Sequence, residues 1–63
     1  MKVRDALHIL HKDGWQLTRT RGSHRQFTHP SKPGLVTLAG HPGDELAPGT
    51  WNSIRRQAGW RRT

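Results

Sequence analysis

The sequence has 63 residues and no cysteine, which suffices for one small domain and excludes disulfides, thiol nucleophiles and cysteine-ligated zinc. Eleven Lys and Arg residues against four Asp and Glu residues give a formal net charge of +7, which favours a nucleic acid or an acidic protein as the partner. No apolar run approaches the ~18 residues of a membrane span, so we expect one cytoplasmic domain over residues 1–63 with no membrane contact.

The first predicted element is an amphipathic helix over residues 2–13. Its apolar residues recur at the spacing of one helical face, and they are Val3, Ala6, Leu7 and Leu10. Gly14 suits the left-handed conformation that often follows a helix, so we expect the helix to end just before it.

A hairpin is predicted next, because the hydrophobic period changes from helical spacing to strict alternation. Trp15 and Leu17 alternate with polar residues, and Phe27 does so within the run from His24 to Thr28. If Leu17 and Phe27 both face the core, the residue numbers of any two directly paired residues must add up to an even value. A regular two-residue turn pairs residues i and i+3, whose numbers add up to an odd value. We therefore expect an odd loop of about three or five residues that includes Gly22.

A third strand and a second helix complete the predicted elements. Turn-forming residues fill the segment 29–34, and the β-branched and apolar run 35–39 that follows reads as a strand. Thr50 is expected to cap the last helix, and Gly59 is expected to end it. The apolar face of this helix consists of Trp51, Ile54 and Ala58. Trp60 can either pack against the helix end or stack on a base.

These elements predict an α+β fold of order α-β-β-β-α, in which both helices cover one face of a three-stranded antiparallel sheet. The strand residues expected on the helix-covered face are Trp15, Leu17, Phe27, Val36 and Leu38. Those expected on the opposite face are Gln16, Thr18, Thr20, His24, Gln26, Thr28 and Thr37. The opposite face has no core to form, so a ligand could lie directly across it.

His24 is the candidate acid–base residue, because imidazole titrates near neutral pH and can take or give a proton during phosphodiester cleavage. Arg19, Arg21 and Arg25 are close enough in a hairpin to hold phosphate oxygens without a metal. A Gly-Ser-His turn is by itself a common pattern, and an ordinary exposed strand is the alternative interpretation.

The order of several short motifs resembles the HicA toxin family over nearly the whole chain. They are Gly14-Trp15, Gly22-Ser23-His24 at the start of a strand ending in Phe27, Thr37-Leu38 before His41, and Gly49-Thr50 with Ile54 and Gln57-Ala58-Gly59. Members are small bacterial mRNA interferases with a fold similar to the double-stranded-RNA-binding domain, each neutralised by a cognate HicB antitoxin. The resemblance implies that His24 is the catalytic residue, with mRNA as substrate and a HicB-like antitoxin as partner.

The predicted function is that of an endoribonuclease toxin, with His24 as the acid–base group and neither a cofactor nor a metal. Arg21 and Arg25 would position phosphate, Gly22 would shape the turn, and Ser23 would orient the loop or donate to phosphate. His41 is a second candidate, either for proton transfer or for phosphate contact. The alternatives are an RNA- or DNA-binding module without turnover and an inactive toxin remnant that acts through protein interaction.

The remaining histidines and arginines carry weaker signals. His8 and His11 lie three residues apart, but no carboxylate set accompanies them, so we expect surface residues rather than a metal site. His29 precedes a proline and is expected to serve a turn. The pairs Arg55-Arg56 and Arg61-Arg62 can either complement a helix dipole or extend an RNA track.

Overall fold

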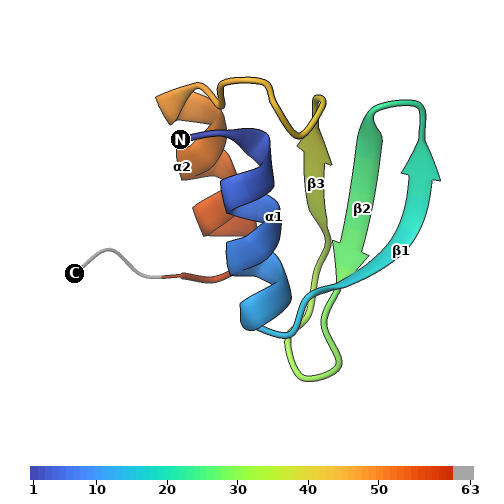
Figure 1. Cartoon of the computed structure of the whole chain (residues 1–63). Coiled ribbons are helices and arrows are strands. Elements are labelled where there is room, and N and C mark those ends of the chain that lie inside the picture. The colour runs from blue at the N-terminus through green and yellow to red at the C-terminus, as the bar shows by residue number, and fades with distance from the viewer. Residues whose placement is uncertain (61–63) are drawn as a thin grey trace.

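The computed structural model describes residues 1–60, which form two helices and three strands in the predicted order (Figure 1). The elements are α1 (Val3–Lys12), β1 (Gln16–Arg21), β2 (His24–Thr28), β3 (Val36–Ala39) and α2 (Pro48–Gln57). The strands form one antiparallel sheet in the order β1-β2-β3, and both helices lie on the same side of it, nearer to β3 than to β1. The predicted α+β fold is confirmed, and its arrangement is consistent with that of a double-stranded-RNA-binding domain.

Helix α1 begins and ends as the sequence predicts, within one residue. The carboxylate of Asp5 accepts a hydrogen bond from the backbone N–H of Lys2, the residue before the helix, at 2.8 Å. Gly14 follows the last helical turn with a φ of +95°, a conformation that residues with a Cβ rarely adopt. A Cβ at this position would also lie 2.9 Å from Nε2 of His29. Glycine is therefore required both by the backbone and by a neighbouring side chain.

Helix α2 begins earlier than predicted. The residue before it is Ala47, and Pro48 occupies the first helical position, where its missing N–H leaves no hydrogen bond unmade. Thr50 therefore lies inside the first turn rather than capping it, so the predicted start of the helix was wrong by three residues. Ala58 and Gly59 follow the last turn, and Gly59 has a φ of +75°, as expected for a residue that ends a helix.

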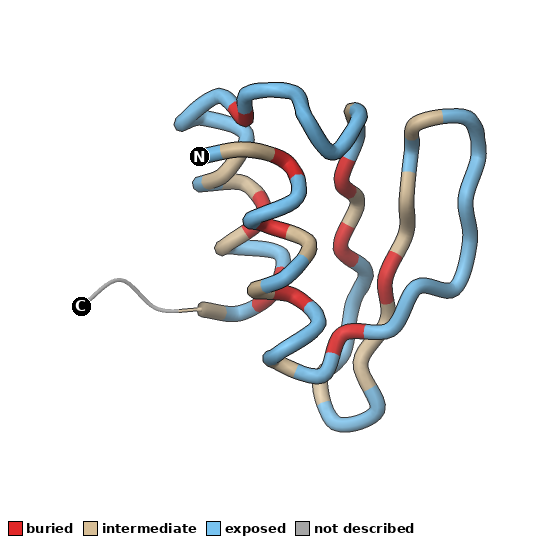
Figure 2. The backbone as a smooth tube through the Cα atoms, viewed as in Figure 1, coloured by how far each residue is buried: buried red, intermediate tan, exposed pale blue. Residues whose placement is uncertain are grey.

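The hydrophobic core lies between the sheet and the two helices (Figure 2). Its buried residues are Val3, Ala6, Leu10, Trp15, Phe27, Val36, Leu38, Leu46, Ile54 and Ala58. Leu46 was not predicted, because it lies in the irregular segment between β3 and α2 and belongs to no periodic apolar pattern. Its backbone N–H donates to the carbonyl of Met1 at 2.8 Å, which brings this segment alongside the N-terminus.

Leu17 is the one predicted core residue on the sheet that the structure exposes, at 54% of its surface. Leu17 pairs with Phe27 and so lies on the same face of the sheet as that buried residue. Strand β1 is nevertheless exposed along its whole length, because the helices lie toward the other edge of the sheet (Figure 2). The predicted burial of Leu17 was therefore wrong, although the predicted face was right: Leu17 lies on the edge strand that the helices do not cover.

The hairpin is closed by a two-residue turn, which corrects the predicted odd loop. Arg21 pairs with His24 across Gly22 and Ser23. Gly22 has a φ of +60° whereas Ser23 does not have a positive φ, which is the pattern of a type II′ turn with glycine at its first central position. Leu17 and Phe27 nevertheless share a face of the sheet, because the pairing register of β1 shifts at an irregularity within the strand.

That irregularity is a bulge at Thr18. Leu17 pairs with Phe27 and Arg19 pairs with Gln26, so Thr18 is an extra residue without a partner in the register. Its Oγ1 donates to the carbonyl of Gln26 at 3.1 Å, which ties the bulge to β2. Every residue of β1 after Thr18 consequently lies on the face opposite to the one that uninterrupted alternation would give.

The two faces of the sheet differ from the prediction in this part of β1. Directly paired residues share a face, so Arg19 and Arg21 join His24, Gln26 and Thr37 on the side away from the helices. Thr20 was predicted on that side, but it pairs with Arg25 and lies on the other. The bulge therefore exchanges a threonine for two arginines on the face that carries His24.

Candidate functional site

His24 is the first residue of β2 and follows the Gly22-Ser23 turn directly. It is exposed and pairs with Arg21 of β1 on one side and Ala39 of β3 on the other. The turn is held against the end of β3 by a hydrogen bond from the backbone N–H of Gly40 to the carbonyl of Ser23, 3.2 Å long. The imidazole is thus exposed to solvent, while its backbone is fixed between two neighbouring strands.

A hollow of about 310 Å³ lies beside His24 on the face away from the helices. Five side chains line it, namely Arg19, Arg21, His24, Gln26 and Thr37. None of them is acidic, and two carry a permanent positive charge. Such a hollow suits an anion that also offers hydrogen-bonding groups, which is the chemistry of a nucleotide.

Arg19 and Arg21 line this hollow because of the bulge at Thr18. Arg19 pairs with Gln26 and Arg21 pairs with His24, so both follow the register that begins after the bulge. No side-chain hydrogen bond or ion pair engages either guanidinium among residues 1–60. Both groups are therefore free to contact phosphate beside the imidazole.

Arg25 does not join this group. It shares the helix-covered side of β2 with Phe27, and its Nη1 donates to the carbonyl of Gly40 at 2.8 Å. This half-buried contact connects β2 to the loop after β3. Of the residues predicted to bind substrate, the structure thus brings Arg21, Gly22 and Ser23 together with His24, and it places Arg25 on the other face.

His41 lies in the loop that follows β3, two residues beyond Ala39, the partner of His24. Its side chain is exposed, and its backbone N–H donates to Oδ2 of Asp44 at 3.0 Å. The N–H of Asp44 donates back to the carbonyl of His41 at 2.9 Å, so the loop forms a closed local turn. Its role in proton transfer or phosphate contact remains a prediction.

A family model described as the HicA toxin of bacterial toxin-antitoxin matches residues 3–60. The chain belongs to the HicA toxin family. The match covers nearly all of the sequence and includes both helices, the sheet and the His24 hairpin. The family consists of toxins of bacterial toxin–antitoxin systems, and HicA-family toxins are ribonucleases. No curated protein matches the chain.

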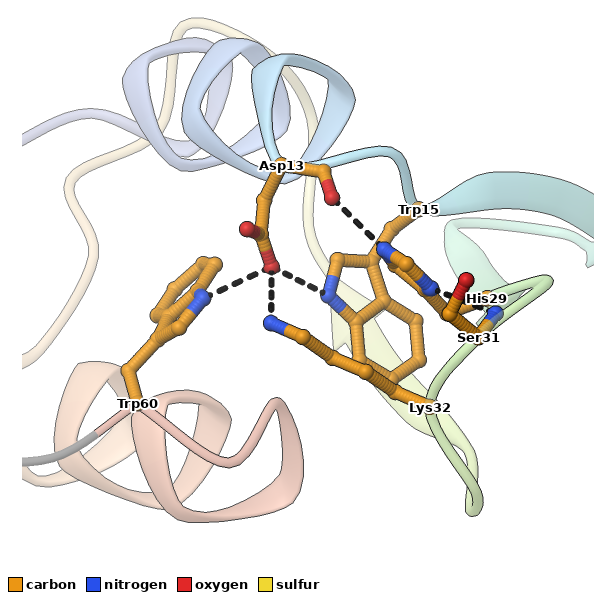
Figure 3. A network of polar contacts seen from close by, with 6 residues as sticks. All are labelled: Asp13, Trp15, His29, Ser31, Lys32 and Trp60. Atoms are coloured by element: carbon orange, nitrogen blue, oxygen red, sulfur yellow. Dashed lines mark hydrogen bonds and ion pairs between the residues drawn. The ribbon is translucent and has the colours of Figure 1, made fainter.

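The HicA-family chain has a second polar cluster at the other end of the sheet, centred on Asp13 (Figure 3). Oδ2 of Asp13 accepts hydrogen bonds from Nζ of Lys32 at 2.7 Å, Nε1 of Trp60 at 2.8 Å and Nε1 of Trp15 at 3.0 Å. The hydrogen bond from Lys32, followed by that from Trp60, holds the pKa of the Asp13 carboxyl below its ordinary value despite partial burial. This carboxylate connects three segments of the chain, namely the junction between α1 and β1, the loop between β2 and β3, and the end of α2.

His29 belongs to the same cluster. Its Nδ1 accepts the backbone N–H of Ser31 at 3.0 Å, so its Nε2 carries the hydrogen in the neutral ring and donates to the carbonyl of Asp13 at 2.7 Å. The ring also packs edge-on against Trp15, with centroids 5.2 Å apart. Both ring nitrogens are therefore engaged, which confirms the predicted turn role of this histidine.

Trp60 packs at the end of α2, as one of its two interpretations predicted. Its ring lies against Trp51 with centroids 5.7 Å apart, and both rings pack against the core. Its backbone N–H donates to the carbonyl of Arg55 at 2.9 Å, in the manner of a helix-terminating motif. The indole N–H is occupied by Asp13, so packing, rather than base stacking, explains the position of this residue.

The structure also bears on the arginines of α2 and on the possibility of a metal site. A hollow of about 460 Å³ lies on α2, in the helical layer rather than on the face with His24. The residues that line it are Asn52, Arg55, Arg56 and Trp60. An RNA track at Arg55 and Arg56 therefore remains a prediction, and Arg61 and Arg62 lie outside the described residues.

Over residues 1–60, no three His, Cys, Asp or Glu side chains are arranged to hold a metal ion. No helix in this range has the length and apolar character to cross a membrane.

Proposed function

We propose that this chain is an endoribonuclease toxin that cleaves mRNA by metal-independent acid–base catalysis, with His24 as the proton-transferring group. The supporting observation is the exposed imidazole in a hollow that it shares with two guanidinium groups, neither of which has a side-chain hydrogen bond or ion pair within residues 1–60. Family membership adds independent support, because the toxins of this family are ribonucleases.

The proposed reaction uses the 2′-hydroxyl of the substrate as the nucleophile. A base takes the 2′-hydroxyl proton, the oxygen attacks the adjacent phosphorus, and an acid protonates the 5′-oxygen as its bond to phosphorus breaks. His24 performs one of these proton transfers, and His41 is the candidate in this chain for the other. Arg19 and Arg21 stabilise the additional negative charge on the phosphorane, which replaces the role that a metal would otherwise have.

The turn residues have a supporting role in this proposal. Gly22 adopts the positive φ that starts the type II′ turn, and so places His24 directly opposite Arg21. Ser23 anchors the turn through its carbonyl, which leaves its hydroxyl as a candidate donor to phosphate. Arg25 contributes indirectly, because its bond to Gly40 holds the loop that leads to His41.

The test is cleavage of a fluorescent RNA by the purified protein in excess EDTA. We expect the rate to be unchanged by EDTA, since the described residues offer no metal-binding cluster and two arginines can neutralise the phosphate. A preparation of His24→Ala is the control for contaminating ribonucleases. Loss of cleavage in EDTA and its return with a divalent ion would refute metal independence, whereas tight RNA binding with no cleavage would favour the binding module.

The proposed protein partner is an acidic, HicB-like antitoxin that covers the face carrying His24. An acidic partner would be attracted by the net charge of +7 and would exclude RNA from the hollow. RNA and the antitoxin should therefore compete for one site, and the His24 imidazole resonance should shift on complex formation. A ternary complex with RNA still bound would instead indicate an indirect mechanism.

A further inference from the structure

Gln26 lines the hollow beside His24, and neither the family match nor the proposed proton transfers assign it a role. It lies on the central strand β2, half-buried, and pairs with Arg19 on one side and Thr37 on the other. Among residues 1–60, no side-chain hydrogen bond uses its carboxamide, although its backbone carbonyl accepts one from Thr18. The amide is therefore available to a ligand at the point where the hollow meets the sheet.

The groups in the hollow have two different chemistries. Arg19 and Arg21 offer only donors and positive charge, which match phosphate oxygens. Gln26 offers a donor and an acceptor side by side, and Thr37 adds a hydroxyl that can do either. Phosphate oxygens only accept, so they leave the carbonyl of the amide unmatched. The edge of a nucleobase presents adjacent donors and acceptors and matches both groups.

The backbones of Gln26 and Thr37 are both held by side chains from outside the hollow. Oγ1 of Thr18 donates to the carbonyl of Gln26 at 3.1 Å. Oε1 of Gln57, at the end of α2, accepts the backbone N–H of Thr37 at 3.0 Å. These contacts fix the backbones of the two residues, so less conformational entropy is lost when a ligand binds.

We propose that this hollow binds one unpaired RNA base next to the scissile phosphate, and that Gln26 selects the base through the donor–acceptor pair of its carboxamide. Thr37 supplies a further hydrogen bond, and Arg19 and Arg21 hold the flanking phosphates. The base must be unpaired, because a base inside a duplex has its pairing edge occupied and its faces stacked. This inference rests on the proposed ribonuclease function, and it makes Gln26 the specificity-determining residue of that reaction.

The experiment sequences the cleavage sites that the protein makes in an RNA pool of random sequence. Gln26→Leu removes the donor and acceptor at similar volume, so discrimination at one position beside the cut should fall by about tenfold. Gln26→Glu replaces the donor by an acceptor and should change which base is preferred. Gln16→Glu is the matched control, because Gln16 is exposed, lies on the same face at the far end of the sheet and does not line the hollow. Its base preference should equal that of the wild type.

A second arm measures binding of short single-stranded homopolymers to His24→Ala, with and without Gln26→Leu. If the wild type cleaves with a base preference that Gln26→Leu retains, the inference is overturned and the ribonuclease function stands. If the wild type cleaves nothing but base-selective binding depends on Gln26, the ribonuclease proposal fails and base selection by Gln26 survives. If neither cleavage nor binding distinguishes bases, the role of Gln26 is wrong.

Discussion

The two histidines at the ends of β2 have opposite environments. His24 begins the strand, is exposed and lies in a hollow with two arginines. His29 follows the strand and engages both ring nitrogens, one with Ser31 and one with Asp13. Only His24 is in a position to exchange protons with a ligand. Residue type alone therefore does not distinguish the two histidines, whereas the hydrogen-bond partners of their ring nitrogens do.

The two regions also differ in charge. Asp13 places a carboxylate among Lys32 and two indole N–H groups, so the cluster around His29 satisfies its own charges and donors. The hollow around His24 has positive charges and no acid among its lining residues. We interpret the first region as a structural connection and the second as a surface for binding and chemistry.

The largest expected effect on stability comes from Asp13→Ala. Removing the carboxylate leaves Lys32, Trp15 and Trp60 without their shared acceptor and should lower the free energy of unfolding by about 2 kcal/mol or more. Tryptophan fluorescence during urea unfolding measures this directly. Glu45→Ala, which removes an exposed contact with the N-terminus, is the control and should cost less than about 1 kcal/mol. Equal losses in the two variants would contradict a structural role for the Asp13 cluster.

A smaller effect is expected on RNA affinity. Arg19→Ala and Arg21→Ala should each weaken binding several-fold at low salt and reduce the slope of log K against log salt by about one, because one phosphate contact is lost. Arg4→Ala removes the same charge from an exposed position on α1 and should leave the slope nearly unchanged. Arg25→Ala should instead lower stability by about 1 kcal/mol, since it loses the bond to Gly40. If Arg4 and Arg19 behave alike, net charge rather than the hollow governs binding.

The smallest effect concerns pH. The folded-state pKa of Asp13 lies below its unfolded value, so its stabilisation is complete above the unfolded pKa and is lost as pH falls through the folded pKa. We expect the free energy of unfolding to decrease on acidification below about pH 4, and to decrease less in Asp13→Asn. Urea unfolding at several pH values between neutral and acidic gives both curves. Parallel curves for the wild type and the variant would show that Asp13 does not contribute.

Local patterns in the sequence were sufficient to predict the elements and their order. Periodicity predicted α1 and the two strands of the hairpin, and Gly14 marked the end of the first helix. The bulge at Thr18 could not be predicted, because a bulge arises from an extra unpaired residue in one strand and no residue type marks that position in the sequence. The assumption of regular pairing therefore gave the wrong loop length and placed Thr20, rather than Arg19 and Arg21, on the face with His24.

Contacts between residues distant in the sequence could not be predicted either, both in the Asp13 cluster and in the hollow beside His24. The Asp13 cluster joins positions 13, 15, 32 and 60, which no local pattern connects. Gln26 was assigned to the correct face, but only the fold shows that it lines a hollow with His24. His24 could be singled out because its turn motif is local and resembles that of a known family. Residues of a site are thus predictable where the motif is contiguous, and their neighbours across strands are not.

The most direct test of the account is chemical rescue of His24→Ala. With RNA saturating the protein, cleavage should fall at least about a hundredfold, since general acid–base catalysis is lost, while RNA affinity and the unfolding midpoint stay unchanged. Because His24 is exposed in an open hollow, added imidazole should reach the vacated position and restore part of the rate. Cleavage by His24→Ala at the wild-type rate, without imidazole, would contradict the assignment of His24 as the catalytic residue.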